Sequence, residues 1–174
     1  MKGDPVEPVV FKPIGVIHTP FPHPKGAPIQ PSRSSHMKGW IELSPEFIPG
    51  LSDLDGFSHI TLLYHFHLSE GFDLAVIPYL DTQLRGLFST RAPRRPNAIG
   101  LSVVRLAGIE GGTIHIEDVD MVDGTPLLDI KPFVPAFEDP DSYQLGWLEG
   151  KTHRAGDTSD DGRFSDSEQP GDGE

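Results

Sequence analysis

Residues 98–119 read AIGLSVVRLAGIEGGTIHIEDV, and this stretch decides the fold class. It holds two β-rich runs, Ala98–Ile109 and Gly112–Val119, which are separated by Glu110-Gly111-Gly112. Paired glycines supply the positive φ angles of a tight turn without steric cost. The stretch therefore predicts two strands joined as a hairpin.

Shorter β-rich runs lie on both sides of this hairpin and are bounded by Pro or Asp-Gly breakers. We expect strands at 14–18, 38–43, 57–68, 85–90 and 127–130, a helical turn at 52–54 and a short helix at 141–148. No alternation of strands with long helices is visible, which argues against a Rossmann-type sheet. Six or seven short strands with frequent turns predict an all-β fold, a small closed or nearly closed β-barrel.

The length of 174 residues fits one domain with a tail. We place the domain at residues 8–151 and expect a disordered acidic tail at 152–174, because that segment has too little apolar surface to offset its ordering entropy. We expect its removal to leave activity unchanged or slightly improved. The absence of Cys excludes disulfides, thiolate metal sites and a Cys nucleophile. No signal peptide or membrane span is visible, so we expect a cytoplasmic protein.

Basic residues are concentrated in two windows, although the net charge is −12. Residues 8–41 and 82–109 contain no Asp or Glu, and they hold nine of the eleven Lys and Arg of residues 1–150. Two alternatives remain open for this pattern. The windows form either an anion-facing surface or chance clusters on solvated loops.

The segment 85–102, RGLFSTRAPRRPNAIGLS, is the densest local signal. Pro93 and Pro96 stiffen a corner between two strands. Arg91, Arg94 and Arg95 present planar guanidinium groups that suit a carboxylate or a phosphate. By physical chemistry alone the segment is either a rigid anion-binding loop or a structural corner. His65 and His67 share a strand face but lack a third ligand at suitable spacing, so we expect no metal.

The chain resembles the TsaA-like/TrmO family in the order of its landmarks from about residue 11 to about 149. The most specific landmarks are Arg95-Pro96-Asn97 and Asp123-Gly124-Thr125-Pro126. Others are Ile14–Ile17, Gln30-Pro31, Leu54–His59, Phe66-His67, Gly86–Arg91, Ala98–Ser102 and Asp129–Pro132.

This resemblance implies an antiparallel, non-Rossmann β-barrel that binds S-adenosyl-L-methionine (SAM) and works as a homodimer. Because a monomer would leave the long Pro-rich loop Pro20–His36 unsupported, we expect the dimer interface to help complete the cofactor pocket. It implies methyl transfer from SAM to N6 of threonylcarbamoyl-adenosine next to the tRNA anticodon. The positions that correspond to the family's cofactor contacts are Gln30, Pro31, Ser32, His67, Leu68, Arg91, Leu101, Asp123, Gly124, Thr125 and Pro126.

If tRNA is the substrate, we expect its anticodon stem-loop to dock on the two basic windows, with Arg94 and Arg95 as contacts to the phosphate backbone. The catalytic residue stays unknown, with Asp129 and His67 as candidate bases. Two other functions stay open: a non-catalytic module that binds SAM or a nucleotide, and a methyltransferase of a small molecule.

Overall fold

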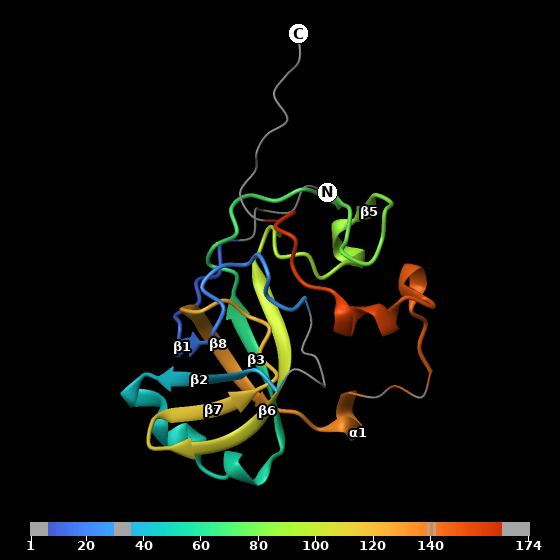
Figure 1. Cartoon of the computed structure of the whole chain (residues 1–174). Helices are drawn as coiled ribbons and strands as arrows, with labels where there is room; N and C mark the ends of the chain where they lie inside the picture. The colour runs from blue at the N-terminus through green and yellow to red at the C-terminus, as the bar shows by residue number, and fades with distance from the viewer. Residues whose placement is uncertain (1–6, 30–35, 139, 141, 165–174) are drawn as a thin grey trace.

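The computed structural model of the chain describes residues 7–29, 36–138, 140 and 142–164. Six strands close into an antiparallel barrel in the order β1-β2-β7-β6-β3-β8, and β4 and β5 form a separate ribbon (Figure 1). The barrel strands are β1 (Gly15–His18), β2 (Lys38–Leu43), β3 (His59–His65), β6 (Ile99–Glu110), β7 (Thr113–Glu117) and β8 (Thr125–Pro132). The ribbon strands are β4 (Ala75–Val76) and β5 (Arg85–Gly86). The all-β barrel expected from the sequence is confirmed.

The helices are short. They are α1 (Pro135–Glu138) and the 3₁₀ helices η1 (Pro45–Leu51), η2 (Leu54–Gly56), η3 (Leu87–Ser89), η4 (Gly146–Leu148) and η5 (Thr152–Asp157). Within the described ranges, no helix has the length and apolar character needed to cross a membrane.

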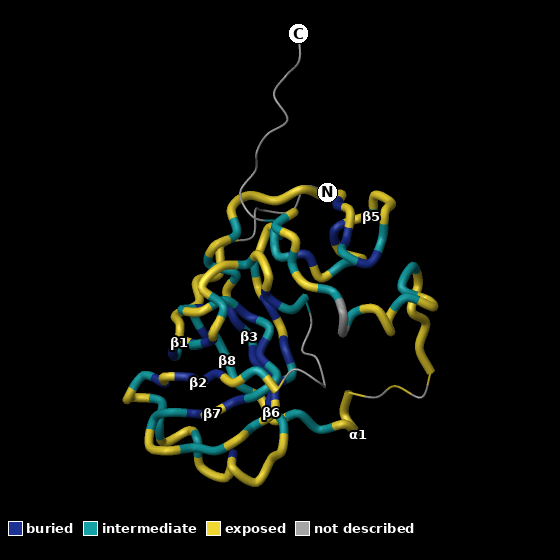
Figure 2. Tube along the Cα trace, in the orientation of Figure 1, coloured by how far each residue is buried: buried dark blue, intermediate teal, exposed yellow. Residues whose placement is uncertain are grey.

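The barrel interior is filled by aliphatic side chains that alternate with exposed ones along the strands. In β2, Gly39, Ile41 and Leu43 face inward and their neighbours face solvent. Burying one such aliphatic side chain stabilises the fold by about 1.5–3 kcal/mol. The fully buried interior residues include Ile17, Ile41, Ile60, Leu62, Val104, Ile114, Ile116 and Leu127 (Figure 2). These side chains fill the described interior, so a ligand would bind outside the barrel core.

Strand directions bring the long connections together at one end of the barrel. Both β1 and β7 run antiparallel to β2, and both β7 and β3 run antiparallel to β6. The C-terminal ends of β1, β3 and β7 therefore share one end, where residues 19–37, 66–98 and 118–124 leave the barrel. The opposite end carries residues 44–58, with η1 and η2, and the expected hairpin turn between β6 and β7.

Three sequence-based element predictions are wrong in detail. The strand expected at 85–90 ends at Gly86, because Ser89 Oγ and Thr90 Oγ1 donate to the carbonyls of Gly86 and Leu87, each at 2.8 Å, and close a turn. The helical turn expected at 52–54 does not form there: Ser52 and Asp53 separate η1 from η2, and Asp53 has a φ of +64°. Gly146 has a φ of +57° and limits the helix expected at 141–148 to η4 (residue 141 lies outside the described residues).

The segment after residue 152 corrects the expectation of a disordered tail from that position. Residues 152–157 form η5, Ser159 forms a β-bridge with Pro28, and Phe164 packs on a small apolar cluster outside the barrel. Val76, Leu87 and Ala92 make up that cluster. They need an apolar cover, and Phe164 contributes to it, which is why this acidic segment is ordered. Residues 165–174 of the predicted tail lie outside the described residues.

Candidate functional site

Three adjoining cavities open at the end of the barrel where the long connections meet. The first has a volume of about 90 Å³, the second about 340 Å³ and the third about 630 Å³. The first and second share the walls Pro28, Tyr64, Phe66, Pro93, Asp120 and Asp160. The second and third share Ile29, Tyr79, Thr90 and Arg91. We call this set of cavities the recess, and its size is typical of a small-molecule site.

The corner that carries Arg91 is held by side chain to backbone hydrogen bonds. Arg95 Nη1 donates to the carbonyls of Thr90 at 3.0 Å and Ala92 at 3.3 Å. The Arg95 guanidinium also lies over the Phe88 ring, 5.7 Å from its centroid. These contacts order the backbone on both sides of Arg91, whose exposed side chain lines the second and third cavities.

Strands β3 and β6 supply a chain of polar groups to the second cavity. Tyr64 Oη lies 3.0 Å from Ser102 Oγ, which donates a 2.7 Å hydrogen bond to Asp120 Oδ1. Gly100 permits this arrangement, because a Cβ there would lie 2.2 Å from the Tyr64 ring. Asp120 follows β7 and lines both the first and the second cavity.

Burial changes the acid–base properties of this chain. Desolvation raises the pKa of Asp120 to about 6, although the Ser102 hydrogen bond and the charge of Arg91 act in the opposite direction. Desolvation also raises the pKa of Tyr64, with the Asp120 charge as the second cause. Tyr64 therefore stays protonated at neutral pH, and Asp120 is a carboxylate of increased basicity.

His67 and Leu68 lie just beyond β3 and line the first cavity. Burial lowers the pKa of the half-buried His67, and the neighbouring His65 adds to this effect. His67 is therefore a neutral imidazole at neutral pH, which can donate or accept a hydrogen bond.

The structure brings together five of the predicted cofactor contacts: His67, Leu68 and Thr125 line the first cavity, and Arg91 and Leu101 line the second. Asp123, Gly124 and Pro126 line none of the three cavities. Gln30, Pro31 and Ser32 lie outside the described residues. All these assignments stay predictions.

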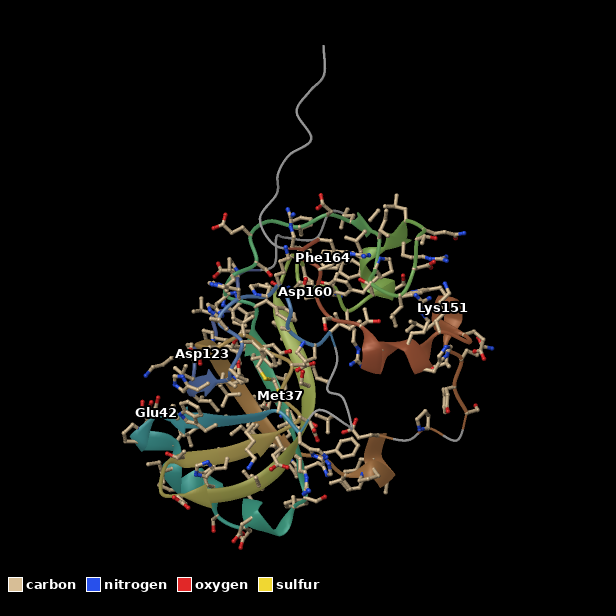
Figure 3. The ribbon with its side chains drawn as sticks, in the orientation of Figure 1. Met37, Glu42, Asp123, Lys151, Asp160 and Phe164 are labelled. Carbon is tan, nitrogen blue, oxygen red and sulfur yellow. The ribbon has the colours of Figure 1, made fainter. Side chains whose placement is uncertain are left out.

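Asp123 lies on the flank of the barrel, near Glu42 in Figure 3. Its Oδ1 accepts a 3.0 Å hydrogen bond from the Thr19 amide and lies 3.2 Å from His18 Nδ1. Met121 and Val122, just before it, are the residues that reach the first cavity. Asp123 therefore orients the chain that carries these cavity residues.

Asp129, a candidate base, lies away from the recess. It borders a fourth cavity with Leu43, Phe47 and Leu54, and its Oδ2 forms a 2.6 Å ion pair with Lys131. Asp129 lies in the middle of β8, opposite Leu63 of β3, and it lines none of the three cavities of the recess. Of the two candidate bases, only His67 lines the recess.

Several cations of the two basic windows are paired with carboxylates from outside those windows. Arg94 Nη2 lies 3.7 Å from Asp73, Arg105 Nε lies 3.4 Å from Glu117, and Lys12 lies 3.6 Å from Glu46. The positive potential that the two windows present to an anion is therefore weaker than their number of Lys and Arg residues alone predicts.

The sequence reasoning missed Tyr64, Ser102, Asp120, Asp160 and Phe164 as site residues. Asp120 had one usable signal, a carboxylate directly after the predicted strand 112–119 and close to the Asp123-Gly124 turn. Asp160 and Phe164 had none beyond the single aromatic residue in a polar segment. Figure 3 shows both beside the β4–β5 ribbon, at the end of the barrel that holds the recess.

Comparison with known proteins gives a consistent result. Residues 16–139 match the family model of the tRNA-methyltransferase O N-terminal domain. A probable S-adenosyl-L-methionine-binding protein of Pyrococcus abyssi is 50% identical over 156 residues, which cover 90% of this chain and 85% of that protein. The mouse tRNA (adenine(37)-N6)-methyltransferase is 39% identical, over 79% of this chain and 33% of the enzyme.

Solved structures agree with this result. A crystal structure of TrmO has a TM-score of 0.70 and 39% identity, with 80% of this chain and 64% of that chain covered. TrmO from Pseudomonas aeruginosa has a TM-score of 0.69 and 37% identity, with 80% and 62% covered. The chain thus spans just under two thirds of these structures and about a third of the mouse enzyme.

Proposed function

We propose that this chain, which belongs to the tRNA-methyltransferase O N-terminal domain family, binds SAM in the recess and transfers its methyl group to N6 of threonylcarbamoyl-adenosine next to the anticodon of a tRNA. The observation that carries the proposal is the position of Arg91, His67, Leu68, Leu101 and Thr125 around adjoining cavities at one end of the barrel. Relatives named as SAM-binding proteins and as adenine-N6 methyltransferases support it.

The residues of the recess fit the chemical groups of SAM. The Arg91 guanidinium suits the carboxylate, and the Asp160 carboxylate suits a cationic group. Leu68 and Leu101 provide apolar surface for an adenine ring, and His67 provides a polar contact. When bound, SAM would supply an electrophilic methyl group on a sulfonium.

The third cavity supports the approach of a nucleoside. It adjoins the second across Thr90 and Arg91 and is lined by Phe88 and Trp147. Trp147 Nε1 donates a 2.7 Å hydrogen bond to the Ser89 carbonyl, which fixes the indole beside the corner. Aromatic faces at a site entrance suit an unstacked base, the form in which single-stranded RNA is recognised.

The protein's own contribution to methyl transfer is alignment and exclusion of water. Holding two reactants in line in one recess can lower the barrier by roughly 7–11 kcal/mol. Arg94 and Arg95 are proposed contacts to the tRNA backbone. Arg95 lines the second cavity beside Arg91 and Arg94 precedes it in the same corner, which supports a role next to the reacting base.

We also propose a homodimer in the cytoplasm, where its tRNA substrate would be available. Exposed apolar side chains near the start of the chain support an interface. Val9, Val10 and Phe11 have 73%, 90% and 63% of their surface exposed. Light scattering at micromolar concentration with SAM should report twice the chain mass, and the monomer mass would contradict the dimer.

Calorimetry with SAM tests the binding half of the proposal. We expect one site per chain, and Arg91→Ala should weaken binding 10- to 100-fold through loss of a charge-assisted hydrogen bond, about 1.5–3 kcal/mol. Arg105→Ala is the matched control, because Arg105 pairs with Glu117 on the barrel wall and should bind normally. Equal affinities for wild type and Arg91→Ala would refute this placement of the cofactor.

A further inference from the structure

Asp120 stands where the first and second cavities meet. It lines both, and its carboxylate is hydrogen-bonded to Ser102 on the neighbouring β6 strand. A methyl donor and its acceptor must meet at a point that both can reach. A carboxylate that borders two adjoining cavities lies where a donor in one cavity and an acceptor in the other would meet, and it can contact the reacting atoms there.

The hydrogen bonds around Asp120 have a defined direction. A serine hydroxyl has one hydrogen, and that of Ser102 points to Asp120 Oδ1 at 2.7 Å. Tyr64 must therefore be the donor in its 3.0 Å contact with Ser102. Both hydroxyl hydrogens are thus directed along the chain toward Asp120, an arrangement that orients its carboxylate and stabilises its ionised form.

We infer that Asp120 is the general base of the proposed methyl transfer and accepts the proton of the substrate N6–H, while Ser102 and Tyr64 act as positioning residues. The inference rests on the proposed function. A urea-like N–H is a poor nucleophile until its proton leaves, so transfer to this nitrogen requires a proton acceptor.

The step balances in atoms and charge. The N6–H bond breaks and its proton goes to a carboxylate oxygen of Asp120. The N6 lone pair forms the bond to the methyl carbon, and the electron pair of the broken carbon–sulfur bond stays on sulfur. Asp120 afterwards releases the proton to water, which restores the carboxylate.

The other titratable groups around the recess are less suited to this role. Asp160 also lines both cavities, but its Oδ1 accepts a hydrogen bond from the Gly162 amide, whereas Asp120 is joined through Ser102 to the Tyr64 hydroxyl. His67 lines only the first cavity. The groups that face Asp120 from packed elements are Tyr64 on β3, His67 after β3, Arg91 and Arg95 in the corner, and Asp160 in the C-terminal segment.

The raised pKa of Asp120, about 6, supports the role. Such a carboxylate is ionised at neutral pH and is more basic than an exposed one, which increases its efficiency as a base. Since the Ser102 hydrogen bond lowers this pKa, its removal should shift the titration of Asp120 to higher pH.

The experiment measures single-turnover methyl transfer at saturating SAM from pH 5 to 9, together with SAM affinity. Asp120→Asn keeps the shape and can still accept from Ser102. It should lower the rate by 10²- to 10⁴-fold and leave SAM affinity within about threefold. Ser102→Ala should keep most of the rate at pH 8 and should shift the acidic limb of the pH–rate profile to higher pH. Asp129→Asn, which removes a carboxylate that lines the fourth cavity and none of the recess, is the control and should match wild type.

A second readout needs no turnover. Carbon-13 NMR of aspartate-labelled, cofactor-free protein should show one carboxyl that titrates near pH 6, is absent in Asp120→Asn and titrates higher in Ser102→Ala. This titration and the shift of the acidic limb keep the inference testable if Asp120→Asn fails to fold.

The outcomes distinguish failure of the base assignment from failure of the proposed function. If wild type methylates tRNA and Asp120→Asn does so at a similar rate, the base assignment is wrong and the proposed function stands. If Asp120→Asn weakens SAM binding tenfold or more but transfers normally at saturation, Asp120 holds the cofactor instead. If wild type transfers no methyl group to tRNA, the proposed function fails and the base assignment fails with it.

Discussion

The backbone amide of Asp160 donates a 2.8 Å hydrogen bond to the carbonyl of Ala27, and the amide of Gly26 donates a 2.8 Å bond to the carbonyl of Asp160. Two segments that are distant in the sequence are thus paired beside the recess. The pairing places Asp160 and Phe164 in its walls. The acidic C-terminal segment, through residue 164, is therefore part of the site.

Truncation after residue 157 should weaken SAM binding at least tenfold. The cut removes the pairing with residues 26–28, the 3.0 Å hydrogen bond from Arg163 Nη1 to the Pro78 carbonyl, and the packing of Phe164. Loss of a partly buried aromatic side chain should also lower the free energy of unfolding by about 1–3 kcal/mol. Calorimetry and urea denaturation measure the two effects. Truncation after residue 164 keeps these contacts and is the control, and normal SAM binding by the shorter chain would remove the segment from the site.

Gly100→Ala should destabilise the protein by about 1–3 kcal/mol, the usual range for overpacking. The new Cβ would lie 2.2 Å from the Tyr64 ring and force that ring out of its hydrogen bond with Ser102. Gly108→Ala is the matched control in the same strand, because no atom lies within 4 Å of a Cβ at that position. Urea denaturation of both variants makes the comparison, and equal stabilities would show that the Tyr64 ring is not fixed there.

Asp120→Asn should stabilise the protein at pH 8, by about 2–3 kcal/mol at most. The pKa of Asp120 rises from 3.8 to about 6 on folding, so the folded state binds the proton more tightly. Stability is therefore lost as pH rises between these two values, and asparagine avoids the loss. Urea denaturation at pH 8 and pH 4 should show the gain at the higher pH only. A loss of stability at pH 8 would mean that the ionised carboxylate supports the fold.

Much of the barrel could be predicted from the sequence, because β-rich runs bounded by Pro or Asp-Gly indicate where strands begin and end. The strand expected at 38–43 has the observed bounds of β2. The strand expected at 85–90 failed because two hydroxyls bond back to the chain and close a turn, a contact that a run of residues does not reveal. The order of residues 152–164 depends on an apolar cluster formed by distant residues, so composition predicted disorder instead.

The family resemblance supplied His67 as a site position, and at Arg91 it agreed with the rigid basic corner that the residues themselves indicate. Asp120 was missed because its importance depends on burial and on Ser102, which lies 18 residues earlier in the sequence but next to it in the barrel. Asp129 was one of two candidate bases, and the sequence could not show that its side chain borders a different cavity from Arg91.

Arg94 and Arg95 should affect tRNA methylation in different ways. Arg94 pairs loosely with Asp73, so Arg94→Ala should raise the KM for tRNA and reduce the salt slope of tRNA binding by roughly 0.7, the value for one lost phosphate contact on a single strand. Arg95→Ala should in addition weaken SAM binding, because Arg95 supports the carbonyls on both sides of Arg91. Filter binding at several salt concentrations and calorimetry measure these effects. Unchanged KM and SAM affinity in both variants would contradict the docking of tRNA at this corner.

Methyl transfer from isotope-labelled SAM to tRNA that carries threonylcarbamoyl-adenosine but lacks its N6-methyl group tests the central claim most directly. After digestion to nucleosides, mass spectrometry should find one labelled methyl group on that adenosine with wild type, and at least a 100-fold lower rate with Asp120→Asn. Wild-type protein that binds SAM but leaves this nucleoside unlabelled would contradict the account. It would leave a SAM-binding module or a methyltransferase of a small molecule in its place.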